Sequence, residues 1–336
     1  MDIVANVSRK ETIKAMTACG VSLSPMSGIA HDEFTQIARE IEDAGFSGVY
    51  IPEANNDVMI CAYAVAKATK RVTIATWIAN IYLRDPMLCA ASAEMVQDAA
   101  DGRFILGLGV SHRPALEARG IELGNLRDRL RHDTLVIRKT LAGEATIFGM
   151  KFRQPKKPVP IYYAALALET ARLAGELSDG LMLYLCPPER MRKSIDVARE
   201  AAKKHGRKPG DVAMTVGLPV FMHNDLKTAY AAAQRGLAFY AALPFYNRLL
   251  ARSGFESAAR TAMEAAARGD TAAMAAAVSE PMADAVALVG PESRCIERLE
   301  QYRKQGAEVP IIVPNAVNED YPACVRRLLK AFAKLN

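Results

Sequence analysis

The chain has 336 residues, of which 51% are hydrophobic and 24% are charged. Packed globular proteins have this composition, so disorder is excluded as the main state. Lysine and arginine number 43 against 37 acidic residues, and the net charge of +6 falls short of the concentrated basic face of a nucleic-acid-binding protein. No stretch reaches the ~20 apolar residues of a membrane span, and the amino terminus lacks the apolar core of a signal peptide. We therefore expect a cytoplasmic protein with neither a nucleic-acid nor a membrane partner.

Short apolar runs alternate with helical patterns along the chain. Eight of these runs are apolar enough to be buried parallel strands. They span residues 18–23, 48–51, 72–79, 104–110, 159–165, 180–185, 212–221 and 309–313.

Helical signals lie between the runs. Phe34, Ile37 and Ile41 recur at the spacing of a helix, and Asp85 followed by Pro86 is typical of a helix start. Further helices are expected from apolar stripes or proline starts within 130–141, 187–206 and 325–332.

Eight strands that alternate with helices predict a closed (β/α)8 TIM barrel, formed as one domain by residues 1–336. An open, doubly wound sheet is the rival, but Gly107 and Gly109 do not begin a complete GxGxxG fingerprint. Residues 222–308 are alanine-rich and helical in pattern. We expect them to form a helical insertion before the last strand, which serves as a lid, a dimer contact or an extra helical layer.

The cysteines and histidines do not indicate a metal site. Six cysteines and five histidines are scattered along the chain, and none has the CxxC or HExxH spacing of zinc sites. Most of the cysteines lie in apolar runs, where a reduced cysteine behaves as a small hydrophobe. We expect no bound metal.

In a barrel of this kind the active site lies at the carboxyl ends of the strands. The strand boundaries therefore select a set of candidates before any family is considered. These are Ser24, Glu53, Asn80, Val110, Ser111, His112, Ala165, Leu166, Cys186 and Asn315.

Two of these candidates can carry a proton. Glu53 could be an acid, a base or a substrate anchor, or it could cap the next helix or pair with an arginine. His112 could exchange a proton near neutral pH, or it could be a loop histidine bonded to the backbone. Arg84 could hold an anion or pair with Glu94 or another helix carboxylate.

The other candidates offer shape and polar edges. Gly107 and Gly109 would let a flat ring or a phosphate approach the backbone, although tight barrel packing also requires glycine. The amide of Asn80 could hold the edge of a heterocycle.

Five segments, in chain order, resemble the luciferase-like superfamily, and in particular its members that use coenzyme F420. The resemblance covers about residues 18–335. Its segments are AGFSGVYIPE (44–53), ATWIANIYLRDP (75–86), DGRFILGLGVSHRP (101–114), PIYYAALALETARLAGELSDG (160–180) and LVGPESRCIERLEQYRKQGAEVPIIVP (288–314).

The resemblance implies where a cofactor would lie. A non-proline cis peptide is expected at Trp77–Ile78, behind a flavin or deazaflavin ring. The strand ends at 109–111 and 165–167 would line the phosphate side, while Glu53 and His112 would face the substrate. The cofactor-contacting residues expected in this way are Trp77, Ile78, Asn80, Gly107, Gly109, Val110, Ser111, Ala165, Leu166 and Ala167.

The sequence departs from its relatives at the phosphate side. Val110 and Leu166 stand where flavin-using relatives have an arginine and a serine, which weakens the case for FMN. Deazaflavin relatives often have threonine in place of Val110 and Gly-Pro in place of Ala167-Leu168.

Our first hypothesis is an F420-dependent oxidoreductase that transfers a hydride to or from a small, partly hydrophobic organic molecule. The alternatives are an FMN-dependent monooxygenase that uses reduced flavin and O2, and a barrel that has lost cofactor and redox chemistry. Relatives are commonly dimers, so a homodimer is also expected.

Overall fold

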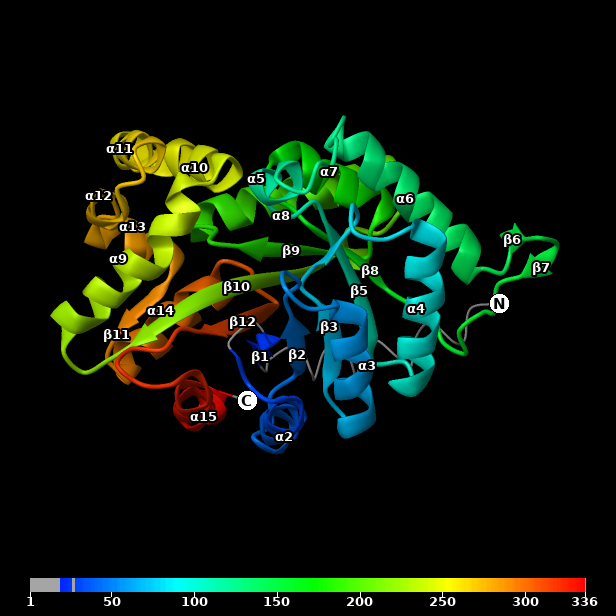
Figure 1. Cartoon of the computed structure of the whole chain (residues 1–336), viewed down its shortest axis with the longest axis horizontal. Helices are drawn as coiled ribbons and strands as arrows, with labels where there is room; N and C mark the ends of the chain where they lie inside the picture. Colours follow the sequence, from blue (N-terminus) through cyan, green and yellow to red (C-terminus); the bar gives the residue numbers. More distant parts are fainter. Residues whose placement is uncertain (1–18, 26–27, 336) are drawn as a thin grey trace.

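The apolar runs form the strands of a closed parallel barrel in the computed structural model, which describes residues 19–25 and 28–335. Each strand pairs with the next around the barrel, and the pairing of the last strand with the first closes it. The barrel strands are β1 (Gly20–Ser22), β2 (Gly48–Ile51), β3 (Thr73–Thr76), β5 (Phe104–Gly109), β8 (Ile161–Ala164), β9 (Gly180–Tyr184), β10 (Ala213–Met222) and β12 (Val309–Pro314). The predicted (β/α)8 barrel is confirmed, and the open doubly wound sheet is not formed (Figure 1).

The third predicted run, 72–79, does not form one continuous strand. It is interrupted after β3 and resumes as β4 (Ala79–Asn80), which pairs with the end of β5. The interruption is the cis peptide bond at Trp77–Ile78, at the position expected from the resemblance.

An outer ring of helices covers the barrel (Figure 1). In α2 the apolar residues Phe34, Ile37 and Ile41 are buried, as their spacing predicts. The Asp85 carboxylate accepts hydrogen bonds from two backbone N–H groups at the start of α4, which confirms the predicted cap. The helices of the ring are α2 (His31–Asp43), α3 (Val58–Ala68), α4 (Pro86–Ala99), α6 (Leu126–Leu141), α7 (Leu168–Leu177), α8 (Pro188–Lys204), α14 (Glu292–Lys304) and α15 (Tyr321–Phe332). Shorter helices are α5 (Arg113–Glu117) and the 3-10 turns Pro209–Asp211 and Ala333–Leu335.

The segment between β10 and β12 is mainly helical but also contains a strand. The short strand β11 (Leu288–Gly290) pairs with the end of β10 and lies outside the closed ring. Two apolar residues and a glycine inside a helical pattern gave no separate strand signal. The other elements are α9 (Leu226–Ala242), α10 (Pro244–Leu250), a π-helical turn (Ala251–Phe255), α11 (Glu256–Ala267), α12 (Thr271–Ala277) and α13 (Glu280–Val286).

The helices α9–α13 gather at one end of the barrel (Figure 1) and form a second apolar cluster together with barrel residues such as Leu185 and Phe221. Alanines such as Ala233 and Ala262 are fully buried there, together with Val278. Small side chains allow close packing of the helices, so the alanine-rich composition produces a compact layer. Whether this layer acts as a lid stays a prediction.

Apolar side chains are exposed on α3, α4 and a small hairpin. They include Ile60 on α3 and Leu88 on α4, and Phe148 is 94% exposed between β6 (Thr146–Ile147) and β7 (Met150–Lys151). The homodimer and the cytoplasmic location stay predictions. Among the described residues, no helix has the length and apolar character needed to cross a membrane.

Candidate functional site

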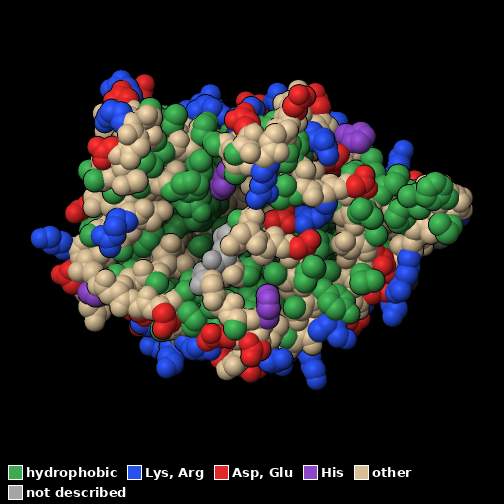
Figure 2. All heavy atoms as spheres, in the orientation of Figure 1, with side chains coloured by type: hydrophobic (Ala, Val, Ile, Leu, Met, Phe, Trp, Pro, Cys, Tyr) green, Lys and Arg blue, Asp and Glu red, His purple; other side chains and the backbone are tan. Residues whose placement is uncertain are grey.

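A cavity of about 1150 Å³ opens between the carboxyl ends of the barrel strands and the helices α9 and α10. Figure 2 shows this face with a hollow near its middle, bordered largely by hydrophobic side chains. Most of the residues selected from the sequence line the cavity. They are Ser24, Glu53, Trp77, Ile78, Asn80, Val110, Ser111, His112, Ala165, Leu166, Ala167 and Asn315, whereas Gly107, Gly109 and Cys186 are not part of its lining.

The two glycines support the cavity wall from behind. A Cβ atom on Gly107 would lie 2.1 Å from the Thr76 carbonyl oxygen, and one on Gly109 would lie 2.8 Å from Cγ1 of Ile78. Both the backbone N–H and the carbonyl of Gly107 hydrogen-bond the Thr76 hydroxyl at 2.8 Å. Tight barrel packing therefore accounts for both glycines, and their role as cofactor contacts stays a prediction.

Trp77 lines the cavity and packs against a third glycine. Its indole contacts the Tyr184 ring edge-on at 5.1 Å between centroids. A Cβ atom on Gly217, in β10, would lie 2.3 Å from atoms of the same indole. The Trp77 ring can occupy its position because Gly217 has no side chain.

Replacing Gly217 with alanine should move the Trp77 ring and cost about 1–3 kcal/mol of stability through overpacking. Because the chain has one tryptophan, its emission spectrum reports this movement directly. The matched control is Gly175→Ala in α7, where the added Cβ would lie 2.0 Å from the Ala198 carbonyl oxygen. We expect both variants to have a lower melting temperature, but only Gly217→Ala to shift the emission maximum. Identical emission from Gly217→Ala and the wild type would contradict this geometry.

Glu53 forms an ion pair at the edge of the cavity. Arg84 contacts its two carboxylate oxygens at 2.5 and 2.9 Å, and the backbone N–H of Asn80 donates to one of them at 2.7 Å. The Glu53 side chain is 1% exposed and that of Arg84 is 14% exposed. Pairing with an arginine was one of the alternatives left open by the sequence. The role of Glu53 as an acid or base stays a prediction.

Arg84 is thus held by Glu53, and also approaches Asp57 at 3.5 Å, instead of pairing with Glu94. Glu94 pairs with Arg153 at 2.8 Å.

The Asn80 side chain shapes the turn that follows β4. Its Oδ1 accepts the backbone N–H of Tyr82 at 3.0 Å. Its Nδ2 has no hydrogen-bond partner among the residues that the structure describes, and it remains a possible donor to a ligand.

The His112 side chain lies next to three aromatic rings and has no polar partner among the described residues. The rings of Phe239, Tyr240 and Tyr246 lie 5.9, 6.1 and 6.0 Å from it between centroids. Burial lowers the pKa of His112 below its usual 6.5, because the imidazolium is poorly solvated there. The ring is therefore neutral at pH 7, and its nitrogens are free to accept or donate a proton.

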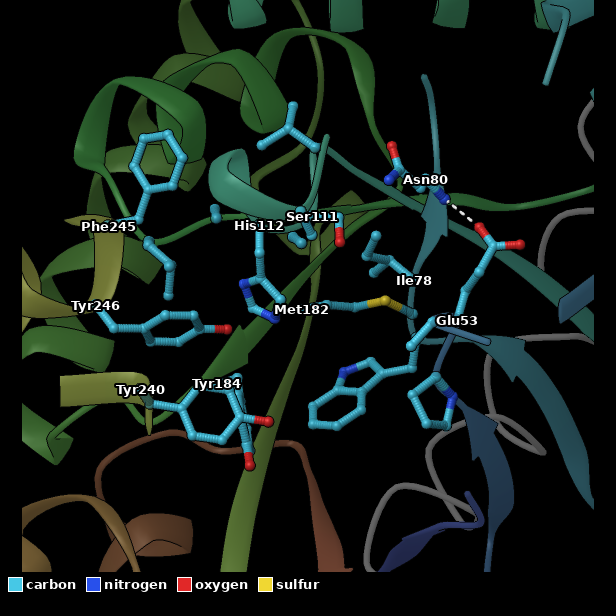
Figure 3. Close-up of a pocket in the computed structure, with 18 of the residues that line it drawn as sticks. Glu53, Ile78, Asn80, Ser111, His112, Met182, Tyr184, Tyr240, Phe245 and Tyr246 are labelled. Carbon is cyan, nitrogen blue, oxygen red and sulfur yellow. Dashed lines mark hydrogen bonds between the residues drawn. The ribbon is translucent and has the colours of Figure 1, made fainter. Parts of the chain in front are cut away.

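The aromatic wall of the cavity consists of Tyr184 from β9, Tyr240 from α9, and Phe245 and Tyr246 from α10. Figure 3 shows it across the pocket from Ile78, Asn80 and Glu53, with His112 and Met182 between the two sides. Sequence reasoning missed the residues from α9 and α10. The signal was present, because the alanine-rich run contains the dipeptide Phe-Tyr twice, at 239–240 and 245–246.

Four arginines line the same cavity and were also missed. They are exposed, and none has a carboxylate within 4 Å in the part of the chain that the structure describes. Arg248 instead packs over the Phe245 ring at 5.0 Å. The four are Arg119, Arg127, Arg248 and Arg252, and we refer to them as the cationic rim. Arginines without acidic partners around an apolar cavity can bind an anionic ligand.

The described residues contain no group of three or more histidine, cysteine, aspartate or glutamate side chains that could hold a metal ion.

Known proteins are similar to this chain over most of its length. A 5,10-methylenetetrahydromethanopterin reductase from Methanolobus tindarius is 29% identical over 293 residues, which cover 84% of this chain and 88% of that protein. The reductase of the same name from Archaeoglobus fulgidus is 28% identical over 284 residues, which cover 79% of this chain and 84% of that protein.

Solved structures share the fold. The coenzyme F420-dependent tetrahydromethanopterin reductase from Methanopyrus kandleri has a TM-score of 0.80 at 18% identity, and the match covers 94% of this chain and 98% of that one. An F420-dependent secondary alcohol dehydrogenase in complex with an F420–acetone adduct has a TM-score of 0.73 at 16% identity, with 95% and 99% covered. A type II Baeyer-Villiger monooxygenase from Pseudomonas putida, in complex with FMN, has a TM-score of 0.64 at 17% identity, with 94% and 98% covered. The model of the luciferase-like monooxygenase family matches residues 13–308, and the chain therefore belongs to this family.

Proposed function

We propose that the protein is an F420-dependent oxidoreductase that transfers a hydride to or from a small organic molecule. The cationic rim carries the proposal, because four arginines without acidic partners surround an otherwise largely apolar cavity. A deazaflavin cofactor with an anionic tail fits this combination: its flat ring would lie in the apolar part and its tail near the rim. The titles of two structural neighbours name the same cofactor.

The residues at the strand ends fit such a cofactor. Ile78 would support one face of the ring, and the amide of Asn80 could bind its polar edge. Ala167 caps α7 without a side-chain hydrogen bond, so the first N–H groups of that helix could assist in binding a phosphate. When bound, the deazaflavin supplies the hydride donor or acceptor, and the protein supplies orientation and proton transfer.

We assign the proton transfer to His112. Its ring is neutral, lacks a hydrogen-bond partner among the described residues, and faces the cavity. If an alcohol is oxidised, His112 would take the proton from its oxygen, and a bound deazaflavin would supply the acceptor for the hydride from its carbon. In the reverse direction the imidazole ring of His112 would return the proton to the carbonyl oxygen of the ketone. Glu53 is better suited to hold Asn80 in position, because its oxygens already bind Arg84 and the Asn80 backbone.

The FMN-dependent monooxygenase remains the second candidate, and the similarity to an FMN-bound monooxygenase favours it. The apolar side chains of Val110 and Leu166 argue against FMN, because neither can bind its phosphate. A barrel without a cofactor is the third candidate.

A fluorescence titration with F420 and, separately, with FMN distinguishes the three. We expect saturable binding of F420, stronger than that of FMN and weakened by salt. Binding of FMN alone would favour the monooxygenase, and binding of neither would favour a barrel without a cofactor.

The double substitution Arg248→Gln and Arg252→Gln should weaken F420 binding by about tenfold or more and flatten its salt dependence, because two exposed attractive charges are lost. The matched control is Arg260→Gln with Arg268→Gln on α11 and the turn after it. These arginines are exposed, lie outside the cavity lining and change the net charge equally. Equal weakening in both double variants would assign the effect to overall charge and would remove the cationic rim as the support for the proposal.

A further inference from the structure

The cavity is slightly larger than the usual pocket for one small molecule. Pockets for a single small molecule occupy about 300–1,000 Å³, and this cavity measures about 1150 Å³. A cofactor ring beside Ile78 would leave the space in front of the aromatic wall for a second molecule. The chemistry of that wall therefore limits what the second molecule can be.

The aromatic wall is rigid because each of its tyrosine rings contacts the others. The Tyr184 and Tyr240 rings lie 5.3 Å apart between centroids, Tyr240 and Tyr246 lie 5.1 Å apart, and Tyr184 and Tyr246 lie 6.1 Å apart. All three pairs meet edge-on, which is a favourable arrangement of aromatic rings. A surface of fixed ring edges and faces packs best against another flat or compact ring.

The wall offers hydrogen bonds but no charge. Burial raises the pKa values of Tyr184, Tyr240 and Tyr246 above the usual 10, so their hydroxyls stay protonated. Figure 3 shows the Tyr246 hydroxyl pointing toward the middle of the pocket, on the side of His112 and Met182. Of the two glutamates in the described lining, Glu53 is paired with Arg84 and lies across the pocket from this wall, and Glu169 is exposed.

A cation would be poorly held in front of this wall, and an anion would be held instead by the exposed arginines of the cationic rim, which line the same cavity. Burial of an ion without a partner of opposite charge is costly, whereas a neutral oxygen needs only a hydrogen-bond donor or acceptor. Tyr246 can donate such a bond, and the neutral ring of His112 can supply a second one.

We propose that the substrate of this enzyme is a neutral, ring-bearing alcohol or ketone, and that Tyr246 is the residue that selects it by hydrogen-bonding its oxygen. The substrate ring packs against Tyr184, Tyr240 and Phe245. This inference rests on the proposed oxidoreductase function for the reaction, but the binding preference belongs to the protein wall itself.

The test measures binding of three probes to the full chain, with and without F420. Cyclohexanol is neutral and ring-bearing, cyclohexanecarboxylate has the same ring with a negative charge, and 2-hexanol is neutral and open. Dissociation constants come from saturation-transfer NMR and from the emission of Trp77, which lies 5.1 Å from Tyr184 between ring centroids. We expect cyclohexanol to bind more tightly than 2-hexanol, and we expect any binding of cyclohexanecarboxylate to depend on the cationic rim and not on Tyr246.

The Tyr246→Phe variant removes one hydroxyl and keeps the ring. It should weaken cyclohexanol binding by about fivefold to tenfold, the effect of one neutral hydrogen bond, while F420 affinity stays unchanged. Tyr63→Phe on α3 is the matched control, because Tyr63 is 40% exposed and lies outside the cavity lining. It should leave all three constants unchanged.

Two results would overturn the inference: carboxylate binding that is tighter than that of cyclohexanol and is weakened equally by Tyr246→Phe, or cyclohexanol binding that is the same in Tyr246→Phe and the wild type. Because the probes are also measured without F420, both results can be obtained whether or not the cofactor binds. Failure of F420 itself to bind would instead count against the proposed function.

Discussion

Replacing Arg84 with methionine is expected to lower the free energy of unfolding by about 3–5 kcal/mol, because it leaves a buried carboxylate without its ion-pair partner. The Glu53 side chain is 1% exposed, and Arg84 contacts both of its oxygens. Methionine keeps much of the apolar stem of the arginine, so most of the loss comes from the unpaired charge. Urea denaturation of the full chain at pH 7 measures the effect.

Glu53→Gln separates the charge from the hydrogen bonds. Glutamine retains an oxygen that can accept the Asn80 N–H, and the stranded Arg84 is 14% exposed and can be partly hydrated. We expect this variant to lose less stability than Arg84→Met. The double variant should be more stable than Arg84→Met alone, since it has no unpaired buried carboxylate. If the costs of the two single substitutions simply add, the ion pair does not have the assigned importance.

The same variants decide between two roles for Glu53. Asn80 lies two residues after Ile78, so the hydrogen bond that its N–H donates to Glu53 anchors the segment that carries Ile78. Loss of F420 affinity together with stability in Glu53→Gln would identify a positioning residue. Slower turnover with cofactor affinity intact would support the acid or base role expected from the sequence.

The barrel was predictable because each strand leaves a local trace. Runs such as 104–110 and 180–185 are continuously apolar, and in a parallel barrel such a run is buried on both faces wherever it pairs. The three-residue strand β11 is too short to leave this trace. The interruption at Trp77–Ile78 left no trace in the apolar pattern either, and it was expected only from the resemblance to relatives.

The site was predictable only in part, for a related reason. Glu53 and His112 could be predicted because each lies just after the end of a predicted strand. The sequence could not decide whether Glu53 pairs with an arginine or caps the next helix, because both Arg84 and the start of that helix are within reach of its carboxylate. Tyr240 and Tyr246 come from helices that fold back over the barrel mouth. Contacts between segments so far apart along the chain have no local signature.

Replacing His112 with asparagine is expected to lower turnover of the F420-loaded enzyme by about 10²–10⁴-fold, the usual contribution of a general acid or base. Asparagine can still form a hydrogen bond but cannot carry the proton. The rate is followed as the change in F420 absorbance, with the best substrate from a panel of ring-bearing alcohols. Affinity for cyclohexanol should change far less than turnover, because Tyr246 and the aromatic wall remain in place.

The pH dependence distinguishes proton transfer from a structural role of His112. Burial lowers its pKa below 6.5, so in the direction of alcohol oxidation the wild-type rate should be flat above that pH and fall as acidification protonates the ring. The unfolded chain, with its ordinary histidine pKa, binds this proton more readily, and the stability contributed by the neutral ring is therefore also lost as the pH falls below 6.5. His112→Asn should lose both dependences, while His31→Asn, at an exposed position, should keep them. An acid limb that persists unchanged in His112→Asn would assign the proton transfer to another group.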